Sequence, residues 1–175
     1  MNIRKFISNA IRYQLTEHIH INHKEYLSWK RKNVTIRGVS NGIGEENGSM
    51  AILGSGLYTA FLSNKQLAKK YGKVYFVVNA VPKSPKIFNT INDWEIWFYN
   101  TLVFKFSKEQ GKEHPDKRDF YEKTSIEAEM QKLGYDGIVI KGREMVNFTP
   151  KDVLYFDDEI QLMDYYENLT MKRTM

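Results

Sequence analysis

The sequence predicts an α+β protein in which most strands pair antiparallel. Segments with the alternation of strands and segments with the periodicity of helices follow one another without the regular strand–helix–strand repeat of a parallel sheet. The chain has 175 residues, of which 42% are hydrophobic. This suffices for one well-filled core and favours a single globular unit.

The first 33 residues are predicted to form a basic helical extension. In "NIRKFISNAIRYQL", apolar residues recur at helical spacing with arginines between them, which is typical of an amphipathic helix and not of a signal peptide or membrane span. Residues 1–33 hold seven Lys or Arg and two Glu, and this excess of five equals the net charge of the whole chain, +5. The excess marks either a solvated helical face or a nucleic-acid-binding segment, in which Trp29 would stack on bases and Lys30, Arg31 and Lys32 would contact phosphates.

The next segments are predicted as strand, turn, helix and strand. "VTIRGV" (34–39) alternates apolar and polar residues, and "VYFVVNAV" (74–81) is a buried strand that ends at the turn "PKSP". Between them, "GSGLYTAFLSNKQLAKKYG" (54–72) contains a glycine turn, a short extended piece and a helix from Asn64 to Tyr71.

The C-terminal half is predicted to alternate helices with short strands. Residues 93–106 favour an aromatic-rich helix, whereas 107–123 favour a solvated loop because the segment is almost without apolar residues. A capping box of Thr124 and Glu127 opens the next helix. The strands "DGIVIK", "EMVNF" and "VLYF" follow, and a last helix lies near "EIQLMDYYENL". The aromatic cluster is interpreted as core: Trp94, Trp97, Phe98, Phe104 and Phe106.

Several kinds of site are not expected. The chain has no cysteine, which excludes disulfides and thiolate metal ligands. His18, His20 and His23 have no carboxylate at ligand spacing, so no metal site is predicted. A phosphate-binding loop of the GxxxxGK type is also missing from the sequence, which argues against an ATP-driven function.

Three motifs resemble the ADP-ribosyltransferase superfamily. "GSGLYTAFLSNKQLAKKYG" is similar to the glycine, tyrosine, small residue, helix, tyrosine segment of its poly(ADP-ribose) polymerase and diphtheria-toxin branch. "TIRGV" resembles the first-strand motif of the superfamily, and "GYDGIVIKGREMVNFTPKDVLYF" resembles its final strands. The motifs stand in the family's order between residues 34 and 160, and the chain as a whole resembles small domains of phage polyvalent proteins and bacterial toxins.

The resemblance implies a fold and an activity. The fold would have two small, mainly antiparallel sheets around an NAD cleft, with peripheral helices, and residues 34–175 would be the catalytic domain. The activity would be mono-ADP-ribosyl transfer from NAD, used as a substrate without a metal, to a macromolecule in the cytoplasm. The resemblance also implies a toxin or phage-conflict effector that a neutralising antitoxin could bind, with no membrane partner.

The resemblance assigns catalytic roles to Glu144, Arg37 and Tyr58. Cleavage at the nicotinamide bond leaves a ribose that resembles an oxocarbenium ion, which a carboxylate stabilises, as in glycoside hydrolysis. Glu144, at the start of "EMVNF", would supply this carboxylate, and Arg37 would donate hydrogen bonds to the diphosphate or ribose.

The same resemblance assigns NAD contacts to residues of the first two motifs. Tyr58 and Tyr71 would hold the nicotinamide between them, because a flat aromatic amide gains from offset stacking. Thr59 is the small residue that follows the first tyrosine. Gly38 would let its main chain approach the carboxamide, because no Cβ intervenes.

Two departures from the family pattern bear on the acceptor. Arg37 stands where the polymerase branch has histidine, and Gly142 stands where transferases that modify arginine carry an acid or amide. The basic extension therefore leads us to favour single-stranded RNA or DNA, narrowly, over protein. An NAD glycohydrolase and a catalytically silent relative that binds nucleic acid are the alternatives.

Overall fold

The computed structural model of the protein describes residues 22–39 and 52–174, and its centre is one mixed sheet of seven strands. The strand order is β4-β5-β6-β2-β1-β3-β7, in which β4 and β5 pair parallel and the other described pairs are antiparallel. The strands are β1 (Val34–Val39), β2 (Leu57–Ala60), β3 (Lys73–Val78), β4 (Pro85–Phe88), β5 (Gly137–Ile140), β6 (Glu144–Asn147) and β7 (Leu154–Phe156).

The α+β class is confirmed, but the expected pair of small sheets is wrong. β1 pairs with β2 through a single residue pair, Ile36 with Ala60, whereas it pairs with β3 from Val34 to Val39. This one pair joins the two halves, β4-β5-β6-β2 and β1-β3-β7, into a continuous sheet. The motifs could not show it, because one main-chain pairing between distant segments leaves no sequence pattern.

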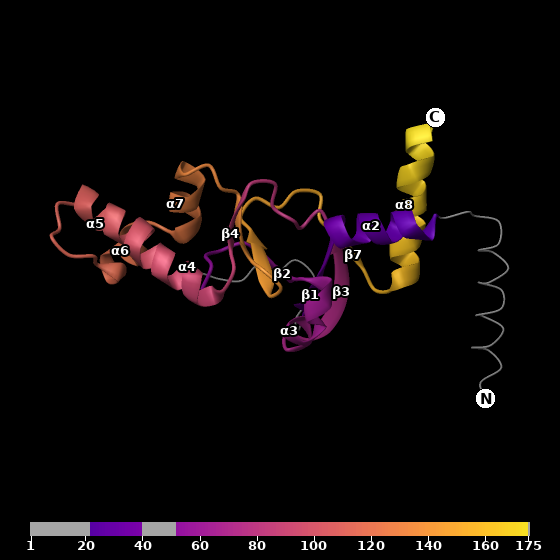
Figure 1. Ribbon diagram of the computed structural model, residues 1–175, viewed down its shortest axis with the longest axis horizontal. Coiled ribbons are helices and arrows are strands. Elements are labelled where there is room, and N and C mark those ends of the chain that lie inside the picture. The colour runs from indigo at the N-terminus through magenta and orange to yellow at the C-terminus, as the bar shows by residue number, and fades with distance from the viewer. Residues whose placement is uncertain (1–21, 40–51, 175) are drawn as a thin grey trace.

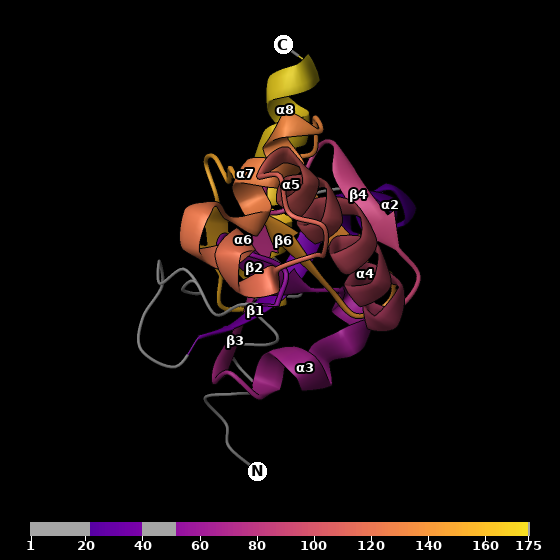
Figure 2. The same cartoon turned by 90° about the vertical axis from the view of Figure 1, so that its left-hand side faces the viewer.

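The helices lie at both ends of the sheet. Figure 1 shows α4 to α7 gathered at one end and α2 with α8 at the other, and Figure 2 shows α3 apart from the first group. The helices are α2 (His23–Asn33), α3 (Lys65–Lys69), α4 (Ile91–Trp97), α5 (Phe104–Glu109), α6 (Lys117–Lys123), α7 (Ile126–Lys132) and α8 (Glu159–Thr174), with the short η1 (Leu62–Asn64) and the π-helical η2 (Phe98–Val103).

The helices that share core clusters with the strands cover one face of the sheet. Ile138 packs under α4, α6 and α7, Ile36 packs against α3, and Val34 packs against α2 and α8. Side chains alternate between the faces along a strand, and directly paired residues share a face, so the registers place these residues on the same side. We call this side the helix-covered face.

The segment 107–123 is only in part the solvated loop that its composition predicts, because residues 110–116 form a loop between two helices. Its first residues complete α5, and Lys117–Lys123 form α6. Asp116 caps α6 by accepting a hydrogen bond from the Asp119 amide, and Phe120 is fully buried. A buried aromatic side chain and a cap, together with ion pairs such as that of Lys112 with Asp116, thus order helices in a strongly charged segment.

The capping box predicted at Thr124 and Glu127 is also wrong. Ser125 is the N-cap residue of α7, because its hydroxyl accepts a hydrogen bond from the Ala128 amide. The Thr124 hydroxyl instead donates to Glu129, 2.8 Å away. The cap lies one residue later than predicted, which leaves Glu127 free for another contact.

The described part of the basic extension packs with the rest of the protein. Tyr26 of α2 is 1% exposed and shares a core cluster with Val34 and with Leu162 and Tyr166 of α8. The amphipathic helix predicted before it lies outside the described residues. Among the helices that are described, none has the length and apolar character needed to cross a membrane.

Gly38 is the position where this packing tolerates a side chain least. A Cβ at residue 38 would overlap the carbonyl oxygen of Ala68 and lie 3.1 Å from the Cβ of Tyr71. We expect Gly38→Ala to lower the free energy of unfolding by about 2 to 3 kcal/mol, because α3 must move away from β1. Gly111→Ala is the control, since it has a φ of 72° and no atom within 4 Å, and should lose about 1 kcal/mol from backbone strain alone. Urea denaturation of both variants tests this; equal losses would contradict it.

Candidate active site

Tyr58 and Glu144 lie on the helix-covered face of two adjacent strands. Ala60 of β2 pairs directly with Glu144 of β6, and Tyr58 is two residues from Ala60, so the phenol and the carboxylate share that face. Their electrostatic coupling agrees with this placement. Burial is the main cause that raises the pKa of Tyr58 above its ordinary value, and the charges of Glu144 and Glu127 add to the increase.

The Tyr58 side chain is held by the turn that precedes its strand. Its hydroxyl donates to the carbonyl of Gly54, 2.8 Å away, and accepts a hydrogen bond from the amide of Leu53, 2.9 Å away. Gly54 has a φ of 91°, which only glycine adopts readily. The predicted glycine turn is therefore present, and its main chain orients the tyrosine.

Tyr71 stands at the end of α3, close to Gly38 of β1. The space that a side chain at residue 38 would occupy is filled by the main chain of Ala68, so the absence of a Cβ lets the helix pack closely against β1. The Tyr71 side chain is 57% exposed, and its phenol is among the groups that raise the pKa of Tyr58. The structure thus brings Tyr58, Tyr71 and Glu144 together from three separate segments.

Asn64 links this helix to the turn before β6, and its role was not predicted from the sequence. Its side-chain amide donates hydrogen bonds to two carbonyls, that of Gly142 at 3.4 Å and that of Arg143 at 3.3 Å. These carbonyls belong to the turn immediately before Glu144. Arg143 also donates to the Glu144 carboxylate at 2.8 Å, which holds the carboxylate near the turn.

Arg37 and Thr59 lie on the opposite face. Each alternates with residues of the helix-covered face, Arg37 with Ile36 and Gly38, and Thr59 with Tyr58. The Arg37 guanidinium is 3.4 Å from the Tyr155 hydroxyl and forms no ion pair with the described residues. Arg37 is 8% exposed and Thr59 4%, and the Thr59 hydroxyl has no hydrogen-bond partner within the described part of the chain.

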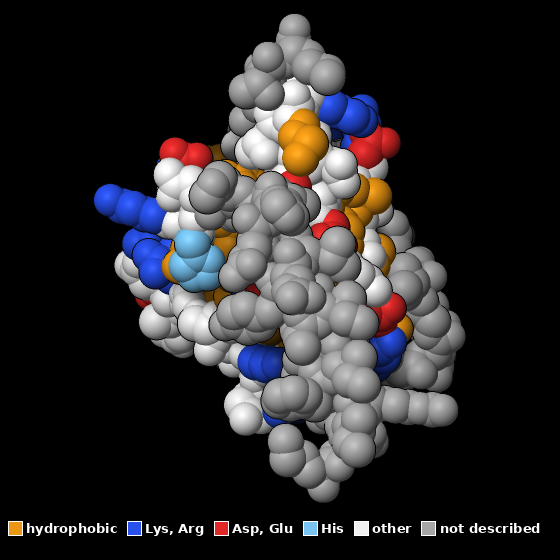
Figure 3. All heavy atoms as spheres, turned by 90° about the vertical axis from the view of Figure 1, so that its right-hand side faces the viewer, with side chains coloured by type: hydrophobic (Ala, Val, Ile, Leu, Met, Phe, Trp, Pro, Cys, Tyr) orange, Lys and Arg blue, Asp and Glu red, His pale blue; other side chains and the backbone are white. Residues whose placement is uncertain are grey.

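The residues predicted to bind nucleic acid do not form a continuous surface. The ring of Trp29 packs on Tyr165 and Tyr166 of α8, and the Lys30 amine forms an ion pair with Glu159. Arg31 and Lys32 remain exposed. In the face shown in Figure 3, Lys and Arg side chains lie in separate groups with Asp and Glu among them, so the described residues present no large field of one sign there.

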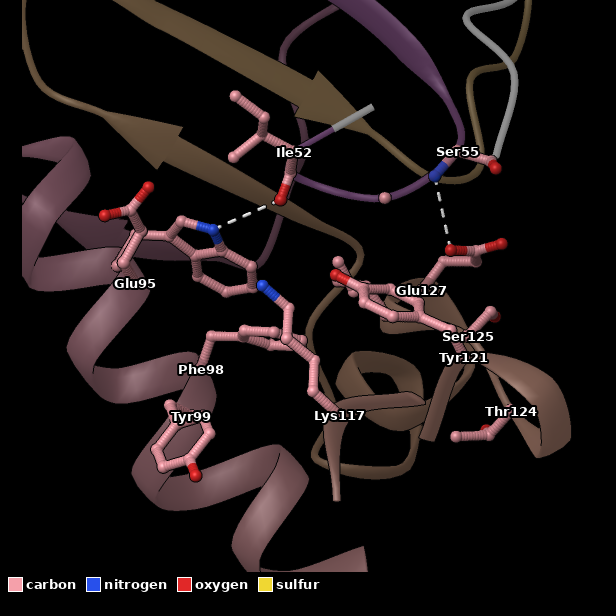
Figure 4. A pocket seen from close by; sticks show the side chains of 13 residues that line it. Ile52, Ser55, Glu95, Phe98, Tyr99, Lys117, Tyr121, Thr124, Ser125 and Glu127 are labelled. Carbon is pink, nitrogen blue, oxygen red and sulfur yellow. Dashed lines mark hydrogen bonds between the residues drawn. The ribbon is translucent and has the colours of Figure 1, made fainter. Parts of the chain in front are cut away.

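A pocket of about 900 Å³ opens beside the Gly54 turn, between α4, η2, α6 and α7 (Figure 4). Trp94 and Phe98, predicted as core, are buried as expected and also line this pocket. The polar residues Lys117 and Glu127 were missed as site residues, one because its segment was predicted to be a loop and the other because it was assigned to a cap.

The described residues contain no group of three or more side chains that could hold a metal ion. Of the three histidines considered from the sequence, His23 is described. His18 and His20 lie outside the described residues.

Searches against family models, curated proteins and solved structures found no match to the chain. The chemistry of the site therefore has to be inferred from its own residues, which are one carboxylate, two phenols and a strand edge.

We expect Tyr58→Phe to destabilise the protein by about 1 to 3 kcal/mol, because the buried Leu53 amide loses its hydrogen-bond acceptor. The raised pKa means that the neutral phenol stabilises the fold below pH 10, and that this contribution is lost as the pH rises above 10. The difference between the parent and the variant should therefore shrink in alkali. Tyr121→Phe is the control, since its hydroxyl has no hydrogen bond to a described residue. Denaturation at pH 7 and pH 10.5 measures both effects, and a Tyr58 variant as stable as the control would refute the assignment.

Proposed function

We propose that the protein is a mono-ADP-ribosyltransferase that cleaves NAD at the nicotinamide bond and transfers ADP-ribose to a macromolecule. The observation that carries the proposal is the arrangement of Tyr58, Tyr71 and Glu144, which come from three segments and lie together on one face beside α3. Sequence order alone does not require these side chains to share a face. For these three residues the arrangement is consistent with what the family resemblance implies, and it supports the proposal.

The carboxylate of Glu144 would act on the ribose. When the bond between the ribose C1′ and the nicotinamide nitrogen breaks, nicotinamide leaves with the electron pair and the ribose gains positive charge. A negative charge nearby stabilises this state more than the ground state, which lowers the barrier. The acceptor nucleophile then forms a bond to C1′ and releases its proton to solvent.

The tyrosines and the edge of β1 would hold the nicotinamide. Tyr71 offers an exposed ring and Tyr58 a ring fixed by the Gly54 turn, which suits offset stacking on a flat amide. Because β1 pairs with β2 only at Ile36, the main-chain groups of Gly38 on that side are not used by a described strand. These groups are the ones that would bind the carboxamide.

Arg37 has a smaller part in this proposal than the sequence predicts. A buried guanidinium without a carboxylate partner among the described residues would be stabilised by an anion such as the diphosphate of NAD. Arg37 and Thr59 lie on the other face, however, so NAD would have to pass between β1 and β2 to reach them. The proposal therefore does not depend on either residue.

Nucleic acid remains the acceptor that we favour, in a cytoplasmic toxin or phage-conflict effector that an antitoxin could neutralise. The basic extension supports it less than predicted, because Trp29 and Lys30 are engaged by α8. Protein is the other candidate acceptor. Incubation with labelled NAD and a cell lysate, followed by nuclease or protease, separates the two: label that survives nuclease but not protease would contradict a nucleic-acid acceptor.

We expect Glu144→Gln to reduce NAD cleavage about a hundredfold or more while NAD still binds, because the substitution keeps the shape and removes the charge. Arg143→Gln is the matched control, because it breaks the same ion pair but leaves the carboxylate in place. It should retain cleavage within about threefold. Nicotinamide release measures turnover, and calorimetry with NAD measures binding.

Three results would contradict the proposal. Unchanged cleavage in Glu144→Gln would exclude Glu144 as the catalytic group. An absence of cleavage in the parent protein, with every acceptor fraction of the lysate, would favour the catalytically silent relative. Cleavage that never labels a macromolecule would indicate an NAD glycohydrolase.

A further inference from the structure

The pocket in Figure 4 adjoins the candidate active site without containing Tyr58 or Glu144. The two sites share the turn at Gly54 and Ser55. The Gly54 carbonyl accepts the hydrogen bond from Tyr58, and the Ser55 amide donates to the Glu127 carboxylate, 3.2 Å away, in the pocket. A ligand in the pocket would therefore lie next to the ring that is proposed to hold nicotinamide.

The walls of the pocket are mainly aromatic. Trp94 and Phe98 form its buried side, and the exposed rings of Tyr99 and Tyr121 form its rim. Phe98 and Tyr99 belong to η2, a π-helical segment between α4 and α5. Such segments occur frequently at functional sites, and exposed aromatic rings offer stacking surfaces to a flat ligand. The volume of about 900 Å³ is within the range of small-molecule sites.

The polar groups of the pocket carry both signs of charge. The side chain of Lys117 extends between the rings of Phe98 and Tyr121, with its amine 5.6 and 6.0 Å from their centres (Figure 4). The amine forms no ion pair with the described residues. Glu127 has one carboxylate oxygen on the Ser55 amide and keeps acceptor capacity for a ligand.

We infer that this pocket binds a guanine base of a single-stranded acceptor, an inference that rests on the proposed function. The pocket offers three features to a ligand: aromatic walls, the Glu127 carboxylate and the Lys117 ammonium. They suit a ring that stacks, donates two adjacent N–H groups to the carboxylate and accepts a hydrogen bond from the ammonium. Guanine has two neighbouring N–H donors on its Watson–Crick edge and the acceptors O6 and N7 beside them. Bases of single strands are commonly bound in this way, by stacking and by contacts to that edge.

The other candidates match fewer of these features. On the Watson–Crick edge, adenine and cytosine have one amino donor next to a ring nitrogen that only accepts. That nitrogen would face a carboxylate oxygen, and the two acceptors would repel each other. The guanidinium of an arginine side chain stacks on aromatic rings and pairs with carboxylates. It has no acceptor for Lys117, however, whose charge would repel it. The Lys117 ammonium, which has no ion-pair partner among the described residues, therefore favours a neutral ring over the guanidinium of a protein side chain.

Calorimetric titration of the full chain with GMP, IMP and AMP, without NAD, tests the inference. IMP differs from GMP by the loss of the amino group at C2. A hydrogen bond from that group to a carboxylate predicts that GMP binds about tenfold more tightly than IMP. AMP should bind more weakly than GMP by a similar factor or more.

Substitutions assign the discrimination to the pocket. Glu127→Gln should bring the affinities for GMP and IMP within about twofold of each other, because the amide cannot accept two N–H groups. Tyr121→Leu should weaken both nucleotides alike, because it removes stacking. Glu122→Gln is the control, since Glu122 is exposed on the same helix, pairs with Arg118 and does not line the pocket. Circular dichroism verifies that each variant is folded.

The outcomes also separate this inference from the proposed function. Equal affinity for GMP and IMP, or no binding of GMP at millimolar concentration, would overturn the inference even if NAD is cleaved. Binding of an N-acetyl-arginine amide in place of GMP would overturn it in favour of a protein acceptor. GMP selectivity that depends on Glu127 would support the pocket even in a protein that does not cleave NAD.

Discussion

The main chain of α3 rests directly on Gly38 of β1, and the candidate active site depends on this contact. A side chain at that position would overlap the Ala68 carbonyl, so only glycine lets the helix approach closely enough for Tyr71 to stand beside the strand. Asn64, just before α3, donates to the turn that precedes Glu144. The close approach thus places the Tyr71 phenol beside β1, and the Asn64 contacts join the start of α3 to the turn before Glu144.

The helices cover one face of the sheet, which brings the proposed catalytic carboxylate of Glu144 and the proposed acceptor pocket to the same side. The turn at Gly54 connects them, because its carbonyl orients Tyr58 and the following amide orients Glu127. Both bonds use main-chain groups, so the connection depends on the shape of the turn. The positive φ of Gly54 gives the turn that shape.

Lysine side chains have different contacts at the two ends of the molecule (Figure 1). At the end formed by α2 and α8, Lys30 pairs with Glu159 and lies over the Phe76 ring, which makes part of the basic run structural. At the end formed by α4 to α7, Lys117 is unpaired among the described residues and stands between aromatic rings. Lys117 therefore keeps capacity for a ligand, whereas Lys30 of the basic run is already engaged.

The sequence alone determined the local elements. The strand at 34–39, the helix after Ser63 and the strand that begins at Glu144 agree with prediction because alternation and helical periodicity depend on neighbouring residues. Tertiary structure decided the single sheet, the fold of 107–123 and the face on which each site residue lies. Tyr58 and Glu144 share a face, whereas Arg37 does not, because strand register depends on pairing between distant segments. A local pattern carries no record of that pairing.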